Sequence, residues 1–369
     1  MHWVDASRRE TMTEEPNDLR ELGVNIWYPT NSTGPAARYM EIDPADPAFR
    51  RSFIYNQLGP ERLAGLRSNA SANVPLSPAR RRYPVVLFSH GLGTVSSLYS
   101  SLIEDLASHG FIVVGIEHAY FSSPFRLSTG QVPGNRSRRP PNRADATQSE
   151  QDRLRAIREE EAIVQAQDLV FALDQLESLA RGKGASPVAG RLDLGRVGVF
   201  GHSRGGFAAP HACSLDRRFD ACLNLDGYRL TEAVMKNGIS QPYMHIQEIA
   251  PWLPPPTEDE LRQAGQTREQ ANAEAEEAAA EFKTTFEKMR GGAFVVTVSG
   301  AVHSSFGDSP LLAPHHYPKA TIAPLRAVEI TRAYIRAFFG RYLQMRRSPL
   351  LQRASPYSEV SIEVFSSPR

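Results

Sequence analysis

One serine flanked by glycines carries the clearest chemical signature in this chain. It lies in the run 201–206 (GHSRGG), which follows the apolar run 196–200 and precedes the small residues 207–209. This order predicts a strand, a sharp turn that carries Ser203, and a helix. Glycines on both sides are typical of such a turn, because its backbone is strained and the strand and helix pass too close for a Cβ atom. Ser203 is therefore the candidate nucleophile.

A serine hydroxyl needs a base to take its proton and an acid to orient that base. After a turn of this kind the chain order is serine, acid, histidine. We expect His303 to be the base, because it follows the predicted strand 293–298 by a short loop and so lies at the carboxyl edge of a sheet. His211, within the helix after the turn, and His245, within a strand pattern, are expected to be structural. The remaining alternatives, farther along an irregular loop, are His315 and His316.

Two carboxylates compete for the role of the acid. Asp226 ends the apolar run 221–225 and stands before Gly227, whereas Glu248 ends the next predicted strand. We favour Asp226, because a carboxylate that breaks an apolar run at a strand tip is placed to meet a partner. The alternative is an aspartate that only begins a turn before glycine.

An ester or amide carbonyl attacked by serine also needs N–H donors for the developing oxyanion. One is expected to be the amide of Arg204, the residue after the nucleophile. The other is expected from the glycine-rich loop 89–93 (SHGLG), which follows the predicted strand 85–89. Leu92 is our candidate there, and His90 is expected to pack rather than to react.

The remaining residues give no sign of a metal or cofactor. No group of histidines, cysteines and aspartates has metal-ligand spacing, and the serine turn lacks the Gly-Lys-Ser/Thr ending of a phosphate loop. We therefore expect no cofactor. Cys213 and Cys222 are the only cysteines, and the sequence leaves open whether they are two buried thiols or a disulfide.

Strand and helix patterns alternate along the chain, which predicts an α/β fold with a mostly parallel sheet in a single domain, 1–369. Helices are expected at 97–108, 150–180 and 327–345. The glutamate-rich segment 254–290 is expected to form a helical cap insertion, and the tail after Ser348 to be loosely held. The expected strands are 22–28, 85–89, 111–116, 197–200, 221–225, 243–247 and 293–298.

Composition excludes several classes of partner. The 369 residues carry 42 Lys and Arg against 41 Asp and Glu, a formal net charge of +1, which predicts no affinity for nucleic acid. No apolar run reaches the length of a membrane span, although contact with a lipid interface is left open. The first twenty residues lack an apolar leader core, so we expect a soluble protein that is either cytoplasmic or exported with its leader already removed. The oligomeric state is left open.

Several separated motifs together resemble the plasma, or type II, platelet-activating factor acetylhydrolases, over most of residues 20–345. They occur in the same order as in that family. They are 25–29 (NIWYP), 82–84 (RYP), 89–93 (SHGLG), 98–100 (LYS), 105–113 (DLASHGFIV), 117–118 (EH), 201–206 (GHSRGG), 217–219 (RRF) and 300–303 (GAVH) ahead of Phe306 and Asp308.

The resemblance implies an α/β-hydrolase fold and a serine esterase without metal. It places the triad on Ser203, Asp226 and His303, and the oxyanion donors on Leu92 and Arg204. The implied substrates are short-acyl esters, including oxidised or short-chain phospholipids. A broad carboxylesterase, lipase or polyester hydrolase with the same machinery is the alternative, and a non-catalytic binding module is the alternative of another class. The family often has phenylalanine where this chain has Arg204, and 254–290 looks longer than in the animal enzymes, so the substrate stays open.

Overall fold

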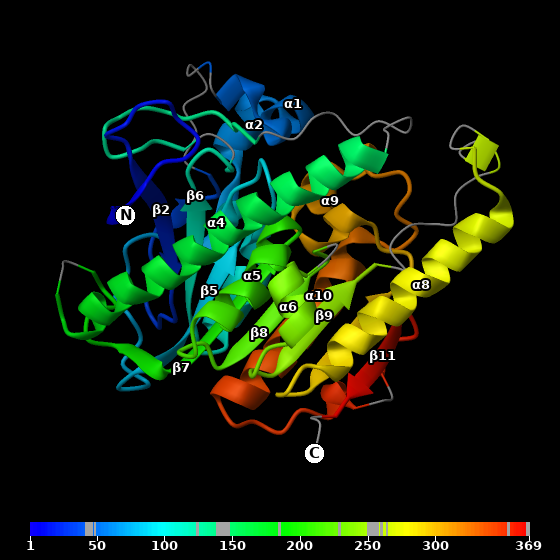
Figure 1. The fold of residues 1–369 in the computed structure, drawn as a ribbon. Coiled ribbons are helices and arrows are strands. Elements are labelled where there is room, and N and C mark those ends of the chain that lie inside the picture. The colour runs from blue at the N-terminus through cyan, green and yellow to red at the C-terminus, as the bar shows by residue number, and fades with distance from the viewer. Residues whose placement is uncertain are drawn as a thin grey trace.

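A mixed sheet of nine strands forms the centre of the part of the chain that is described (Figure 1). The structure is a computed structural model, which describes residues 1–40, 47, 49–122, 125–137, 148–183, 186–227, 230–248, 258, 261–262, 265–352 and 355–366. In spatial order the strands are β1 (His2–Arg9), β2 (Leu19–Trp27), β6 (Ile112–His118), β5 (Tyr83–Ser89), β7 (Leu192–His202), β8 (Ala221–Leu225), β9 (Tyr243–Gln247), β10 (Ala293–Val298) and β11 (Val360–Phe365).

The six strands from β6 to β10 in this order are parallel to one another. Residues of β5 and β7 pair in register, with Phe88 opposite Phe200 and Ser89 opposite Gly201. Every residue of β5 is buried, as expected of a central strand covered on both faces. The loops that leave the parallel strands therefore begin at a common edge of the sheet.

Helices cover both faces of the sheet (Figure 1). On one face the long helix α4 packs through Ala166, Leu169, Leu173 and Leu176, which recur at helical spacing and are buried. Among the described residues no helix combines the length and the apolarity needed to cross a membrane. The helices of that face are α4 (Gln148–Ala180), α5 (Arg204–Leu215), α6 (Glu232–Asn237) and α8 (Arg268–Glu287), and those of the other face include α3 (Ser100–Ser108) and α10 (Pro324–Leu343).

The smaller elements lie outside these layers. The strands β3 (Ala36–Arg38) and β4 (Arg67–Ser71) form a separate antiparallel pair. The short helices are α1 (Phe53–Leu58), α2 (Pro60–Gly65) and α9 (Ser309–Leu312). Single 3-10 turns include Ser96–Tyr99 and His303–Phe306.

The seven predicted strands are all present, but the expectation of a loosely held tail after Ser348 is wrong. Strand β11 pairs antiparallel with the whole of β10, from Ala293 opposite Phe365 to Val298 opposite Val360. Strand β1 likewise pairs with β2 and had no predicted counterpart. Both are edge strands with alternating polar residues, so neither shows the continuous apolar run of the buried strands.

Helix α8 makes up most of the described part of the predicted cap insertion 254–290. Its C-terminal half packs against the sheet, with the rings of Phe282 and His245 at 5.2 Å and Phe286 buried. Residues 249–257, 259–260 and 263–264 lie outside the described residues, so a cap over the site stays a prediction. Cys213 and Cys222 are buried free thiols rather than a disulfide.

Candidate active site

Ser203 lies at the turn between β7 and α5. Its backbone angles, φ 55° and ψ −115°, are rare for residues other than glycine. The neighbouring glycines are required by close approach of the backbone. A Cβ atom on Gly205 would lie 2.0 Å from the carbonyl oxygen of Ser89, and one on Gly201 would lie 2.3 Å from the carbonyl carbon of Gly205. The sequence GHSRGG thus allows the helix to begin directly against the sheet.

The structure brings Ser203, His303 and Asp226 together. The hydroxyl of Ser203 lies 2.8 Å from Nε2 of His303, and Nδ1 of the same ring lies 2.5 Å from Oδ2 of Asp226. Since a carboxylate only accepts, Nδ1 carries the proton, and Nε2 is left to accept from the serine hydroxyl. The three side chains come from the ends of β7, β8 and β10, which share one edge of the sheet.

A local turn holds Asp226 toward the imidazole. Asp226 has a φ of 53°, and its amide donates to the carbonyl oxygen of Ile246 at 2.7 Å. The side chain of Asn224 closes the turn by accepting from the Gly227 amide at 2.7 Å. Asp226 Oδ1 also accepts from the backbone amide of Glu248 at 3.2 Å. The carboxyl of Asp226 is therefore fixed from both sides.

Glu248, the competing acid, lies near His303 but makes a different contact. Its carboxylate accepts a hydrogen bond from the backbone of His303 rather than from the ring. Burial, and then the charge of Asp226, raise the pKa of the Glu248 carboxyl. The described hydrogen bond to the imidazole ring comes from Asp226, whereas the described contact of Glu248 is with the backbone.

The loop after β5 lies against the nucleophile. A Cβ atom on Gly91 would lie 3.3 Å from Cβ of Ser203, so glycine is needed for this approach. The backbone amides of Leu92 and Arg204 have no acceptor among the described residues, whereas the next amide, that of Gly93, donates to the carbonyl oxygen of Phe121 at 2.7 Å. Two unsatisfied amides, one next to Ser203 in the chain and one on the loop that lies against it, are suited to hold an oxyanion.

The other histidines are used elsewhere. His211 bonds Thr231 at 2.9 Å, and His245 lies 3.0 Å from the hydroxyl of Tyr243. His90 is fully buried and bonds Ser122 at 2.7 Å through Nε2. His315 and His316 are exposed in a 3-10 turn. None of these five has a described hydrogen bond to Ser203.

One cluster of the described residues has the geometry of a metal site, namely His202, Asp226 and His303, whose candidate ligand atoms lie within 4.8 Å of one another. Both ring nitrogens of His303 are engaged by Ser203 and Asp226. Both ring nitrogens of His202 are also engaged, by the His303 carbonyl oxygen and by Tyr99. The ring nitrogens are thus committed to hydrogen bonds, which argues against this cluster as a metal site.

Comparison with known proteins identifies the family. Residues 48–348 match the family described as platelet-activating factor acetylhydrolase, isoform II. The chain belongs to this family. The resemblance inferred from the separated motifs is thereby confirmed.

Individual relatives agree with this placement. The platelet-activating factor acetylhydrolase of Gallus gallus is 24% identical over 327 residues, which cover 80% of this chain and 71% of that protein. The one from Cavia porcellus is 28% identical over 260 residues, 65% of this chain and 51% of that protein, so the chain spans about half the length of this relative. A solved ferulic acid esterase from Streptomyces cinnamoneus matches 98% of this chain and 94% of its own, with a TM-score of 0.73 and 29% identity. These matches confirm the predicted α/β-hydrolase fold.

Two features of this family member were not found from the sequence. The Arg204 side chain forms a buried ion pair with Glu161 of α4, and His202 bonds Tyr99. Tyr99 and His202 both lie in motifs that carried the family resemblance, which is the one signal that pointed to them. Their partners are far away in sequence, so the contacts themselves leave no local pattern.

A second serine, histidine and aspartate are linked in the same way where β5 ends and the loop that carries Leu92 begins. Ser89 Oγ lies 2.8 Å from His118 Nε2, and His118 Nδ1 lies 2.8 Å from Asp168. All three are fully buried, and Arg20 binds the Asp168 carboxylate through two nitrogens. Burial lowers the pKa of His118 to about 4. A hydroxyl without access to substrate is structural, so this group supports the end of β5.

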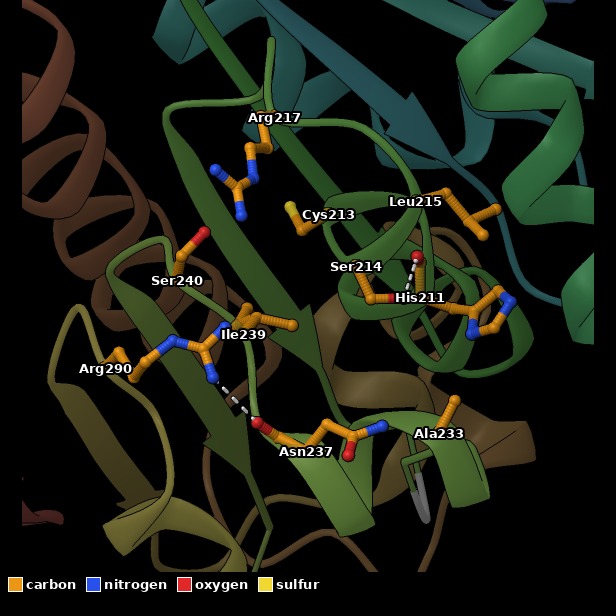
Figure 2. A pocket seen from close by; sticks show the side chains of 11 residues that line it. His211, Cys213, Ser214, Leu215, Arg217, Ala233, Asn237, Ile239, Ser240 and Arg290 are labelled. Carbon is orange, nitrogen blue, oxygen red and sulfur yellow. Dashed lines mark hydrogen bonds between the residues drawn. The ribbon is translucent and has the colours of Figure 1, made fainter.

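A cavity of about 320 Å³ lies at the opposite edge of the sheet (Figure 2). It lies between the C-terminal ends of α5 and α6 and the segments that precede β9 and β10. The guanidinium groups of Arg217 and Arg290 point into it, and Arg290 donates to the carbonyl oxygen of Asn237 at 3.0 Å. None of its lining residues belongs to the Ser203 site, so this cavity is separate from the candidate active site.

Proposed function

We propose that this protein hydrolyses carboxylic esters through an acyl-enzyme formed on Ser203. The observation that carries the proposal is the continuous hydrogen-bonded line from the Ser203 hydroxyl through both nitrogens of His303 to Asp226. Ser203 lies on a strained strand-to-helix turn, which supports the same assignment. The amides of Leu92 and Arg204, which have no acceptor among the described residues, support it as well. Membership of an acetylhydrolase family supports it independently.

In the first half of the reaction, His303 Nε2 takes the hydroxyl proton while Ser203 Oγ attacks the ester carbonyl carbon. The carbonyl oxygen becomes an oxyanion, which the amides of Leu92 and Arg204 stabilise. Asp226 holds the ring with its proton on Nδ1 and stabilises the imidazolium. The proton on Nε2 then passes to the leaving alkoxide, which departs as the alcohol and leaves the acyl group on Ser203.

In the second half, His303 takes a proton from water, and the resulting hydroxide attacks the acyl carbon. The oxyanion again lies against the same two amides. Collapse returns the proton to Ser203 and releases the carboxylic acid. The net reaction consumes one ester and one water and requires no metal or organic cofactor.

For the substrate we propose short-acyl esters, including phospholipids with a short second acyl chain. The support is the family match and the names of the relatives from Gallus gallus and Cavia porcellus. A carboxylesterase for simple alcohols or phenols is the second candidate. It is favoured by the near-complete overlay on the Streptomyces cinnamoneus ferulic acid esterase, since 98% of this chain is covered.

The mechanism is tested by labelling with a fluorophosphonate probe, which reacts with activated serines. We expect one adduct, on Ser203, and no adduct in the Ser203→Ala variant. Ser214→Ala, an exposed serine at the far end of the same helix, is the matched control and should label normally. Absence of any adduct on the unmodified chain would favour a non-catalytic binding module.

The substrate is tested by comparing kcat/KM values. The panel contains p-nitrophenyl esters of short and long acids, a phospholipid with an acetyl second chain, methyl ferulate and a soluble polyester. Preference for the acetyl phospholipid over the simple esters supports the first candidate. Higher values on simple esters or polyester would support the broader esterase.

A further inference from the structure

A chain of hydrogen bonds joins the loop of His303 to the loop of the oxyanion donors. His202 Nε2 lies 3.0 Å from the carbonyl oxygen of His303, and His202 Nδ1 lies 2.8 Å from the hydroxyl of Tyr99. The same hydroxyl oxygen accepts from the backbone amide of Gly91 at 3.3 Å. Gly91 immediately precedes Leu92. The chain therefore runs from the base to the residue beside the proposed oxyanion donor.

The partners of this chain determine the His202 tautomer. A carbonyl oxygen only accepts, so His202 carries its proton on Nε2 and donates it to His303. Nδ1 is then an acceptor, and the Tyr99 hydroxyl at 2.8 Å is placed to donate to it. The Tyr99 oxygen accepts from the Gly91 amide and also lies 3.3 Å from the Thr94 hydroxyl, which itself donates to the Gly91 carbonyl oxygen at 2.7 Å. Burial raises the pKa of Tyr99 to about 12 and, as the largest effect, lowers that of the His202 ring. Both groups therefore stay neutral at pH 7, as the chain requires.

The chain is enclosed by packing. His202 is 6% exposed and Tyr99 is 2% exposed. The His202 ring lies 4.6 Å from the ring of His303, and Tyr99 lies 4.7 Å from Phe88 of the central strand β5. Water cannot readily replace a lost partner at such a position, so the two rings hold both loops at a fixed separation.

We propose that His202 and Tyr99 are positioning residues that set the distance between the base and the oxyanion donors. The proposal rests on the esterase function proposed above. Neither side chain has a described hydrogen bond to the reacting atoms: His202 donates to the backbone of His303 and packs against its ring, and Tyr99 accepts from the amide of Gly91. Their effect should therefore appear in the transition state, where the base and the oxyanion donors must act together, and much less in substrate binding.

The Tyr99→Phe variant tests this directly, because it removes one oxygen and keeps the ring packing. It leaves His202 Nδ1 and the Gly91 amide without partners, and we expect the two loops to move apart. For p-nitrophenyl acetate we expect kcat to fall about 10- to 100-fold with KM within about twofold, less than the loss of a whole oxyanion donor. The rate of fluorophosphonate labelling should fall in parallel.

Tyr83→Phe provides a matched control. Tyr83 is a second fully buried tyrosine, and its hydroxyl donates to the carbonyl oxygen of Ser77 at 3.0 Å. It is the first residue of β5, at the end of the strand away from the active-site loops. We expect the control to lower the free energy of unfolding about as much as Tyr99→Phe and to leave kcat within about twofold. Equal losses of kcat in both variants would assign Tyr99 a merely structural role and overturn the proposal.

A double-mutant cycle with His202→Gln adds a second measurement that does not depend on one variant alone. Because the two residues act in one chain, the double variant should lose little more kcat than the worse single variant. Fully additive losses would overturn the proposal. If the unmodified chain neither labels nor hydrolyses esters, the esterase function itself fails. If it does both and Tyr99→Phe keeps its kcat, only the positioning proposal fails.

Discussion

Arg204 and Glu161 form an ion pair with almost no exposure, and it ties the first residue of α5 to the middle of α4. The Glu161 carboxylate also accepts from the hydroxyl of Ser137 at 2.9 Å. The residue that offers its backbone amide to the proposed oxyanion site thus has its side chain anchored in the neighbouring helix.

Glu161→Gln should therefore destabilise the fold strongly. The substitution removes the charge that faces the buried guanidinium, and breaking one side of such a pair costs about 3–5 kcal/mol. Urea unfolding followed by circular dichroism measures the change. Asp174→Asn on the same helix is the control, because its partner Arg218 and Asp174 itself are substantially exposed, and we expect little change there. A similar loss in both variants would contradict a special role for burial of the Arg204 pair.

The choice of acid can be decided by two variants. Asp226→Asn cannot hold the His303 ring with its proton on Nδ1 in the same way, so kcat should fall roughly 10³–10⁴-fold while the protein stays folded. Glu248→Gln keeps an oxygen that can accept from the backbone of His303, and we expect kcat to change less than about tenfold. Steady-state kinetics on p-nitrophenyl acetate measures both. The reverse order of effects would transfer the role to Glu248.

The parts of this site that could be predicted from the sequence are those that end buried parallel strands. Ser203, Asp226 and His303 each follow an apolar run, and parallel strands deliver their carboxyl ends to one edge. That geometry brings residues 100 and 77 positions apart to the same edge of the sheet, where the structure has them within hydrogen-bond distance. The glycines beside Ser203 could also be predicted from the sequence, because the strand and the helix approach each other too closely there for a residue with a Cβ atom.

The parts that could not be predicted depend on side-chain direction or on weak periodicity. Tyr99 and His202 are 103 positions apart, and their contact requires ring orientations that no local pattern encodes. The ion pair of Arg204 requires Glu161 to lie opposite it along α4, a helix of 33 residues, and no local pattern encodes that position. The edge strand β11 alternates polar and apolar residues over only six positions, so it resembles a polar tail.

Buried neutral histidines predict a loss of stability in mild acid. Burial lowers the pKa of His118 to about 4 and that of His245 to about 3, whereas the unfolded side chains titrate near 6.5. Between these values the unfolded chain binds more protons, so the free energy of unfolding falls as the pH drops from about 7 to 4. The contribution of His118 is on the order of 3 kcal/mol.

Asp308 has the opposite effect on the free energy of unfolding. Burial raises its pKa to about 6, so in mild acid the folded state binds a proton that the unfolded state does not, and this stabilises the fold. Urea unfolding between pH 5 and 7 measures the balance, and we expect stability to rise with pH. His245→Gln should flatten this slope, whereas the exposed His316→Gln should leave it unchanged. An unmodified protein equally stable at both pH values would contradict the argument.

The C-terminal strand β11 should be essential for the stability of its edge of the sheet, contrary to the expectation of a loosely held tail. A chain that ends at Ser358 loses every backbone hydrogen bond between β10 and β11, together with the buried side chain of Ile362. It also loses Phe365, whose ring lies 5.5 Å from that of Phe286 on α8. We expect the free energy of unfolding to fall by at least about 3 kcal/mol, since truncating one buried isoleucine alone costs about 2–5 kcal/mol.

The same truncation should promote aggregation, because β10 would become an unpaired apolar edge whose amide and carbonyl groups can pair with another chain. Light scattering against concentration measures this, and a chain ending at Ser366, which keeps all of β11, is the matched control. If the Ser358 truncation unfolds at the same urea concentration as the control and scatters no more light, then β11 adds no stability. In that case the pairing of β10 with β9 would be enough to protect β10.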